Sequence, residues 1–179
     1  EILDHDIDYE FRYELVLGSL KTIRERAAVW QPKTPPAWTF AKDRQGWHYQ
    51  NASDTGWPVK EHLHVLFEKD DPQLVSPQTF WKAEESPFLI IDAAFHTTQK
   101  HAVIMWQPYG QESVAAKAAV AFPIQADGEF HQHVIRLADS PGYHGGMIRL
   151  RFDPVGQDET GAWMKLRSVR LASSRPAAD

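Results

Sequence analysis

The chain has 179 residues, no cysteine and a formal net charge of −5 at pH 7. This length suits one domain with an appendage, and such a domain can bury enough apolar surface to fold without disulfide bonds or thiolate metal sites. The negative charge argues against a broad surface for nucleic acid or another polyanion.

No apolar run in the chain is long enough to span a bilayer, and no signal-peptide pattern opens it. The first residue is Glu rather than Met, which favours a processed or excised piece of a longer protein. We therefore expect that a membrane tether or a partner domain belongs to the parent protein.

Residues 8–30 carry apolar side chains at alternating spacings of three and four, which predicts an amphipathic helix. These positions are Tyr13, Val16, Leu20, Ile23, Ala27 and Trp30. Gly18 weakens the first half, and the prolines at 31–36 end the helix, because the residue before a proline is pushed out of the α region. We expect the apolar stripe to pack against the rest of the domain, with pairing to a second copy as the alternative.

From residue 37 onward the apolar period changes to two, which predicts strands. The run at 88–94 is almost entirely apolar and predicts a central strand covered on both faces. Ten strands are expected, at 37–40, 46–50, 61–67, 78–82, 87–95, 101–107, 117–124, 129–137, 147–152 and 162–171. The predicted organisation is an N-terminal helix and proline hinge at 1–35, an all-β antiparallel sandwich at 36–172 and a tail at 173–179.

The segment YHGGMIRLRFDP, residues 143–154, has the clearest alternation. A regular strand would send one set of its side chains into the core and the other set outward. We expect Ile148, Leu150 and Phe152 inside, with Met147, Arg149 and Arg151 on the other face. Pro154 ends the strand because it cannot donate to a ladder.

Together with DPQLVSP at 71–77 and the closing strand at 162–171, this segment resembles the jelly-roll, carbohydrate-binding-module-like domains of bacterial envelope and polysaccharide proteins. The resemblance covers residues 36–172. It implies a non-catalytic module of a larger periplasmic or extracellular protein, with a glycan or polysaccharide as its partner. Tyr143 stands where the resemblance leads us to expect Trp, which leaves the identity of the ligand open.

Aromatic side chains are the candidate platforms for such a ligand, because a sugar presents C–H groups on one ring face and hydroxyls at its rim. We expect Trp38, Trp81 and Trp163 in the core, whereas Trp47, Tyr49 and Trp57 lie in a polar stretch where exposure is easier to accept. Paired guanidiniums on one strand face could grip a carboxylate, sulfate or phosphate, or could simply be neutralised by nearby acids. The candidate ligand residues are Trp57, Trp106, Tyr109, Tyr143, Arg149 and Arg151.

Two histidine pairs occupy alternate strand positions, His62 with His64 and His131 with His133, but the sequence shows no third ligand and we predict no transition-metal site. A structural calcium ion held by carboxylates and carbonyls remains open.

Catalytic motifs are missing from the sequence, with no phosphate loop, nucleophile elbow or dinucleotide fingerprint. A polysaccharide-lyase site could be formed from His133, Tyr143, Arg149 and Gln132. The sequence does not show whether these side chains lie close together. The sequence therefore favours a binding module over an enzyme. The other alternative is a structural or protein-interaction domain that uses the N-terminal helix and a sheet face.

Overall fold

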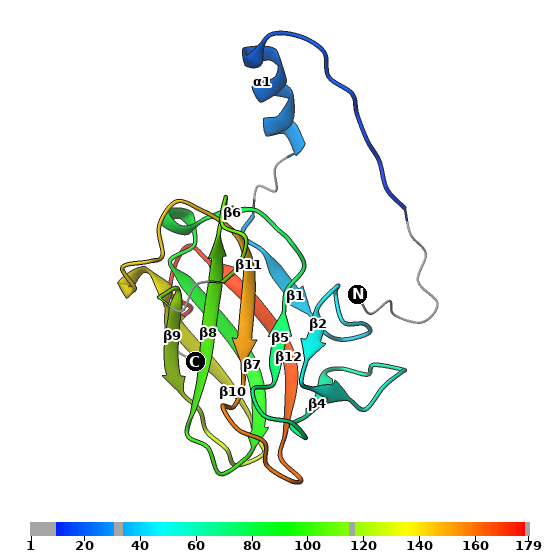
Figure 1. The fold of residues 1–179 in the computed structure, drawn as a ribbon, viewed down its shortest axis with the longest axis vertical. Coiled ribbons are helices and arrows are strands. Elements are labelled where there is room, and N and C mark those ends of the chain that lie inside the picture. Colours follow the sequence, from blue (N-terminus) through cyan, green and yellow to red (C-terminus); the bar gives the residue numbers. More distant parts are fainter. Residues whose placement is uncertain (1–9, 31–33, 115–116, 178–179) are drawn as a thin grey trace.

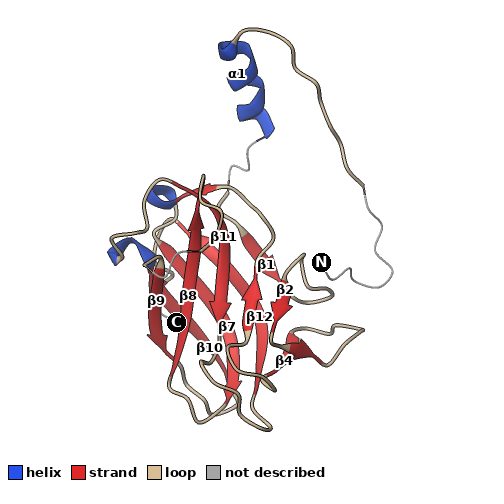
Figure 2. Ribbon diagram, in the orientation of Figure 1, coloured by secondary structure: helices blue, strands red, loops and turns tan. Residues whose placement is uncertain are grey.

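The computed structural model describes residues 10–30, 34–114 and 117–177, which form two antiparallel sheets and one helix. The sheets lie face to face, and the helix stands beyond one end of them (Figures 1 and 2). The prediction of an all-β antiparallel sandwich of the jelly-roll type, preceded by a helix, is confirmed.

Sheet A has the strand order β10-β7-β12-β4-β3, with β1 pairing to β12. Its strands are β1 (Ala37–Thr39), β3 (Ser53–Asp54), β4 (Leu63–Leu66), β7 (Phe88–His96), β10 (Phe130–Arg136) and β12 (Trp163–Ala172).

Sheet B has the order β2-β5-β11-β8-β9, with β6 pairing to β11. Its strands are β2 (His48–Gln50), β5 (Gln73–Val75), β6 (Trp81–Lys82), β8 (His101–Pro108), β9 (Ala119–Pro123) and β11 (Gly146–Asp153). Two short 3-10 turns, Ala83–Glu85 and Leu137–Asp139, follow β6 and β10.

All ten expected strands overlap an observed strand, and the expectation missed β3 and β5. These two strands contain only two and three residues, too few to show a period of two. The central strand predicted at 88–94 is confirmed: β7 lies between β10 and β12, and both Ile90 and Ala94 on its outer side are at most 1% exposed.

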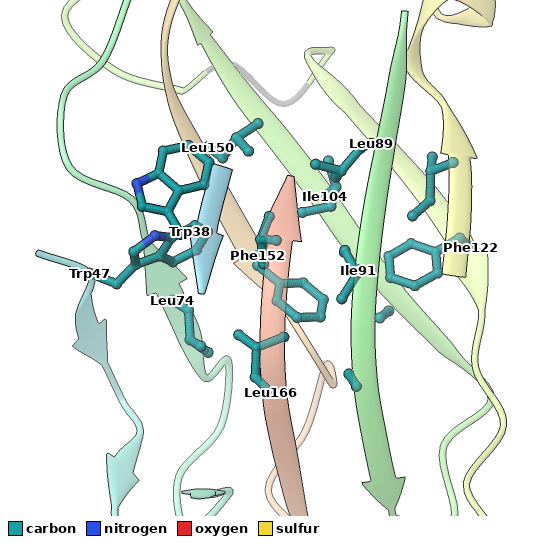
Figure 3. Close-up of a cluster of buried hydrophobic side chains, with 14 of the residues drawn as sticks. Trp38, Trp47, Leu74, Leu89, Ile91, Ile104, Phe122, Leu150, Phe152 and Leu166 are labelled. Atoms are coloured by element: carbon teal, nitrogen blue, oxygen red, sulfur yellow. The ribbon is translucent and has the colours of Figure 1, made fainter. Parts of the chain in front are cut away.

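The core lies between the sheets and is filled from both, as Figure 3 shows for Leu89 and Ile91 of sheet A and Ile104 of sheet B. Within it, the rings of Phe122 and Phe152 stack with centroids 6.1 Å apart. Strands that alternate inward and outward side chains therefore bury one apolar face each, which is the main stabilisation of a sandwich.

Two expectations about tryptophan burial are wrong. Trp47 is fully buried, because its ring packs edge-on against Trp38 and Phe40, with centroids 5.3 and 5.8 Å away. Trp163 is partly exposed, because Met164 takes the inward direction at the start of β12 and leaves Trp163 on the outer face. Trp38 and Trp81 are buried as expected.

The alternation expected in β11 is broken by a bulge between Met147 and Arg149. Met147 and Leu150 are both fully buried although they are three residues apart, so the intervening Ile148 and Arg149 stay partly exposed. The expectation that Ile148 is a core residue is therefore wrong, because an extra residue in one strand shifts the direction of the side chains that follow.

The helix α1 is shorter than expected and spans Leu20–Trp30. Ser19 caps its start, accepting a hydrogen bond from the backbone N–H of Thr22 at 3.2 Å, and residues 10–18 are not helical. Leu20 and Ile23 are 62% and 39% exposed, and the helix projects away from the sandwich (Figure 1). The expected packing of its stripe against the sandwich is wrong, because the strands fill the core without it. No helix in the described part of the chain is both long and apolar enough to cross a bilayer.

Candidate binding site on sheet B

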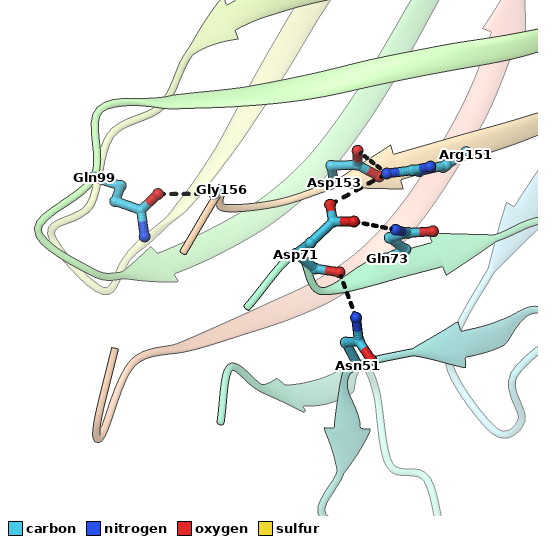
Figure 4. A network of polar contacts seen from close by, with 7 residues as sticks. All are labelled: Asn51, Asp71, Gln73, Gln99, Arg151, Asp153 and Gly156. Atoms are coloured by element: carbon cyan, nitrogen blue, oxygen red, sulfur yellow. Dashed lines mark hydrogen bonds and ion pairs between the residues drawn. The ribbon is translucent and has the colours of Figure 1, made fainter. Parts of the chain in front are cut away.

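The two arginines of β11 that we expected to act together have different surroundings. Arg151 donates from Nε and a terminal nitrogen to the two carboxylate oxygens of Asp153, both at 2.7 Å, and also reaches Asp71 at 3.2 Å (Figure 4). Gln73 donates to the other oxygen of Asp71. Burial raises the pKa of Asp153 above its ordinary value despite the opposing effect of Arg151. The charge of Arg151 is therefore already neutralised within the fold.

Arg149, in contrast, keeps an unpaired charge. No carboxylate of the described residues lies within 4.0 Å of its guanidinium, and its Nε is shielded from water without a hydrogen-bond partner there. The residue pairs with Gln107 of β8, next to the bulge. Of the two arginines, Arg149 is the one with donors to offer a ligand.

Trp106 and Tyr143, two further candidates, belong to the core. Trp106 is fully buried, and its Nε1 donates to the carbonyl oxygen of Gly142 at 3.0 Å. Tyr143 is 6% exposed, and its ring meets Trp106 edge-on with centroids 5.1 Å apart. The expectation that these rings face a ligand on the surface is not met, because each is held by buried hydrogen bonds and ring contacts. The lyase arrangement that drew on Tyr143 loses that residue as well.

Trp57 is 42% exposed, but it lies in the loop between β3 and β4 of sheet A. Tyr109 follows the end of β8 in sheet B. The structure therefore places these two candidates on different sheets.

Tyr109 is 72% exposed and forms a pair with Phe80, a residue that the sequence expectations did not include. The two rings meet edge-on with centroids 6.1 Å apart, and Phe80 is itself 41% exposed. A Cβ atom at Gly146 would lie only 2.9 Å from the ring of Phe80, so the glycine permits this close approach. We call Phe80 and Tyr109 the aromatic pair.

The aromatic pair borders a shallow depression of about 560 Å³. Its lining consists of Gln78, Thr79, Phe80, Tyr109, Gly110 and Ile148. Backbone hydrogen bonds fix both sides: Thr79 N–H donates to the Ile148 carbonyl at 2.9 Å, and Tyr109 N–H donates to the Gly146 carbonyl at 2.8 Å. The bulge that removes Ile148 from the core is thus what places it in this depression.

One signal in the sequence could have pointed to Phe80. Trp81 was expected in the core, and alternation along a strand places its neighbour on the opposite face. An aromatic residue on the outer face is unusual enough to mark a surface site.

The histidine pairs do not form a metal centre in the described residues, where no three His, Cys, Asp or Glu side chains are grouped to hold an ion. His131 contacts both carboxylate oxygens of Asp127 at 2.9 Å, and His133 is only 9% exposed. A structural calcium ion stays a prediction.

No protein-family model matches this sequence, and no curated protein matches it. Solved structures do show a similar fold. The K1 cleaved adhesin domain of Lys-gingipain from Porphyromonas gingivalis W83 has a TM-score of 0.52 at 12% identity, over 79% of this chain and 99% of that one.

Carbohydrate-binding modules are also among the structural neighbours. The low affinity xylan binding module CBM86 from Roseburia intestinalis has a TM-score of 0.46 at 11% identity, covering 76% of this chain and 92% of that one. The CBM35 of Paenibacillus barcinonensis has a TM-score of 0.43 at 10% identity, covering 78% and 99%. At these identities the similarity concerns the fold alone.

Proposed function

We propose that this protein is a glycan-binding module that holds a sugar chain against the aromatic pair. The observation that carries the proposal is the exposure of two adjoining rings, Phe80 and Tyr109, beside a shallow depression on sheet B. Apolar C–H faces of a pyranose stack on such rings, while its hydroxyls require hydrogen-bonding groups nearby. Gln78 and Thr79 in the lining supply those groups.

The shape of the depression supports an extended ligand. A wide, shallow surface suits internal units of a polysaccharide rather than a single enclosed sugar. Arg149 follows Ile148 along β11. Its Nε is enclosed, so only the terminal nitrogens of its guanidinium could reach a hydroxyl or a carboxylate at the border of the platform.

A binding role agrees better with this site than catalysis does. Glycoside hydrolysis requires two carboxyl groups across the bound sugar. The lining of the depression has neither a carboxylate nor an imidazole. We therefore propose a non-catalytic module of a larger protein, acting in the periplasm or outside the cell.

Calorimetric titration against soluble plant, algal and bacterial polysaccharides tests this proposal. We expect at least one polysaccharide to bind the wild type, with binding weakened by Tyr109→Ala at unchanged folding. Absence of heat across the whole panel would favour the second candidate.

That second candidate is a protein-interaction domain, and the N-terminal segment favours it. Residues 10–18 are not helical, and Phe11, Tyr13, Leu15 and Leu17 alternate along them with exposures of 79%, 89%, 82% and 84%. Alternating apolar side chains on an unpaired extended segment are suited to adding a strand to another sheet. Light scattering tests it: a dimer that Leu15→Glu with Leu17→Glu converts to a monomer would support this role.

A further inference from the structure

The outer face of sheet A gathers basic side chains, although the chain as a whole is acidic. Lys165 of β12 is paired in register with His64 of β4, and Trp163 of β12 with His96 of β7. His62 precedes β4, and Arg167 follows Lys165 by two residues on β12. We call the five basic residues the cationic face: His62, His64, His96, Lys165 and Arg167.

Two aromatic rings, Trp163 and Phe130, hold the side chains of the cationic face, and Trp163 contacts three of them. The imidazole of His96 stacks on Trp163 with centroids 5.4 Å apart and an angle of 18°, and His64 meets the same indole edge-on at 5.4 Å. The ammonium of Lys165 lies 4.9 Å from the centre of that ring. These contacts hold an ammonium and two imidazoles beside a π-system, which attracts a cation without cancelling its charge.

The second ring is Phe130 of β10. The guanidinium carbon of Arg167 lies 3.5 Å from its centre, and the ring of His62 is 5.6 Å away. The cationic face therefore extends over four neighbouring strands as one arrangement of rings and basic groups.

None of the five basic side chains pairs with a carboxylate: within the described residues, no acidic oxygen lies within 4.0 Å of them. Elsewhere the fold pairs its arginines closely, as with Arg44 and Asp54 at 2.7 Å or Arg151 and Asp153 at 2.7 Å. When these basic groups are charged, their mutual repulsion costs free energy, which a bound anion would relieve.

A polar hollow of about 140 Å³ continues this surface at the edge of the sheet, where Lys60, His62 and His64 contribute to its lining. Asp54 also lines the hollow, but its carboxylate already accepts hydrogen bonds from Arg44, from Tyr49 and from the backbone N–H of Gly56. The other titratable side chains in the lining, those of Lys60, His62 and His64, are basic.

We propose that the cationic face and this hollow bind an anionic polysaccharide through its carboxylate or sulfate groups, as a second surface on the sheet opposite the aromatic pair. Charge complementarity carries the inference, and the choice of a glycan as the polyanion rests on the proposed function. The net charge of −5 argues against a broad surface for any polyanion, whereas the cationic face is a local group of basic side chains.

Protonation should couple to this binding. Burial lowers the pKa of both His62 and His64, and the charge of Lys165 lowers both further. At His62, His64 and Arg167 also lower the pKa, whereas Glu61 raises it. Lys60 and the paired Asp54 line the same hollow as these histidines. His96 and Asp92 lie on β7, the strand on the other side of β12 from β4. A bound anion favours the charged imidazoles, so binding takes up protons and affinity rises as the pH falls.

The test is calorimetric titration of the whole chain with polygalacturonate, which carries carboxylates, and heparin, which carries sulfates. We expect the wild type to bind one of them more tightly at about pH 5.5 than at about pH 7.5, and less tightly as salt is added. Lys165→Gln with Arg167→Gln should reduce the affinity by about tenfold or more. The matched control is Arg136→Gln, which removes an exposed charge paired with Asp139 in another part of sheet A. This variant should change the affinity by less than about twofold.

His62→Gln with His64→Gln provides an independent variant, which should retain binding at about pH 7.5 but lose most of the gain on acidification. The inference is overturned if the wild type binds neither polyanion at the lower pH, if Arg136→Gln loses as much affinity as the double variant, or if duplex DNA binds as tightly as the glycans. Phe80→Ala with Tyr109→Ala should leave polyanion binding intact. If the wild type binds a polyanion but no neutral glycan, the proposed role of the aromatic pair is wrong and the role of the cationic face stands.

Discussion

Trp81 donates a hydrogen bond from its indole Nε1 to the phenolic oxygen of Tyr143, with the two atoms 2.9 Å apart inside the sandwich. The phenol in turn donates to the carbonyl oxygen of Ser86 at 2.9 Å. This chain of bonds ties β6 and the turn after it to the segment that precedes β11. It makes Tyr143 a structural residue.

Removing the hydroxyl should therefore destabilise the fold. Tyr143→Phe leaves the Trp81 donor and the Ser86 acceptor buried without partners, and we expect a loss of about 1 to 3 kcal/mol in the free energy of unfolding. Urea denaturation measures this loss. Tyr109→Phe, at an exposed tyrosine, is the control and should leave the midpoint unchanged. Equal midpoints for wild type and Tyr143→Phe would contradict the buried role.

The ion pair of Arg44 and Asp54 is a second buried contribution, with side chains 10% and 7% exposed. Asp54→Asn removes the negative charge from this buried pair and should cost about 3 to 5 kcal/mol at neutral pH. Asp139→Asn, in an exposed pair with Arg136, should change stability by less than about 0.5 kcal/mol. Similar losses for the two variants would show that the Arg44 pair is not effectively buried.

The stability that the same pair contributes should fall as the solution becomes acidic. Burial alone would raise the pKa of Asp54, but hydrogen bonds from Arg44, Gly56 and Tyr49 hold it below its ordinary value of 3.8. The stability that this shift contributes is complete above the ordinary pKa and is lost as the pH falls through the folded one. The difference between wild type and Asp54→Asn should therefore narrow in acid, and a constant difference would contradict the lowered pKa.

The bulge in β11 can be tested with two substitutions on the same strand. Phe152 is fully buried, so Phe152→Ala should cost about 3 to 5 kcal/mol through the cavity that it leaves. Ile148 lies outside the core, and Ile148→Ala should cost less than about 1 kcal/mol. Equal losses in denaturant midpoint would indicate a regular strand with both side chains inside.

The sequence predicted the sandwich because apolar side chains recur with a period of two in strands such as β4, whose buried and partly exposed residues alternate. It predicted Ile148 wrongly because nothing in MIRLRF distinguishes a bulge from regular pairing; only the register against β8 shows the extra residue. Alternation therefore fixes the class of fold more firmly than the direction of each side chain.

The binding site was harder to predict for a related reason. Trp106 and Tyr143 are amphipathic aromatics, equally suited to a surface platform or to a core with hydrogen-bond partners. Their partners, Gly142 for Trp106 and both Trp81 and Ser86 for Tyr143, come from other parts of the chain. Tyr109 was identified correctly as exposed, whereas Phe80 became visible as its neighbour only after the sheet had brought β6 and β8 to either side of β11.

The aromatic pair is tested most directly by titrating a polysaccharide that binds the wild type into Phe80→Ala and Tyr109→Ala. Trp57→Ala is the control, because Trp57 lies on the other sheet and is as exposed as Phe80. We predict that each variant of the pair weakens binding by about 1 to 3 kcal/mol, a factor of about 5 to 150, at unchanged thermal stability. Trp57→Ala should bind like the wild type. If Trp57→Ala loses binding while both variants of the pair retain it, the glycan does not bind at Phe80 and Tyr109.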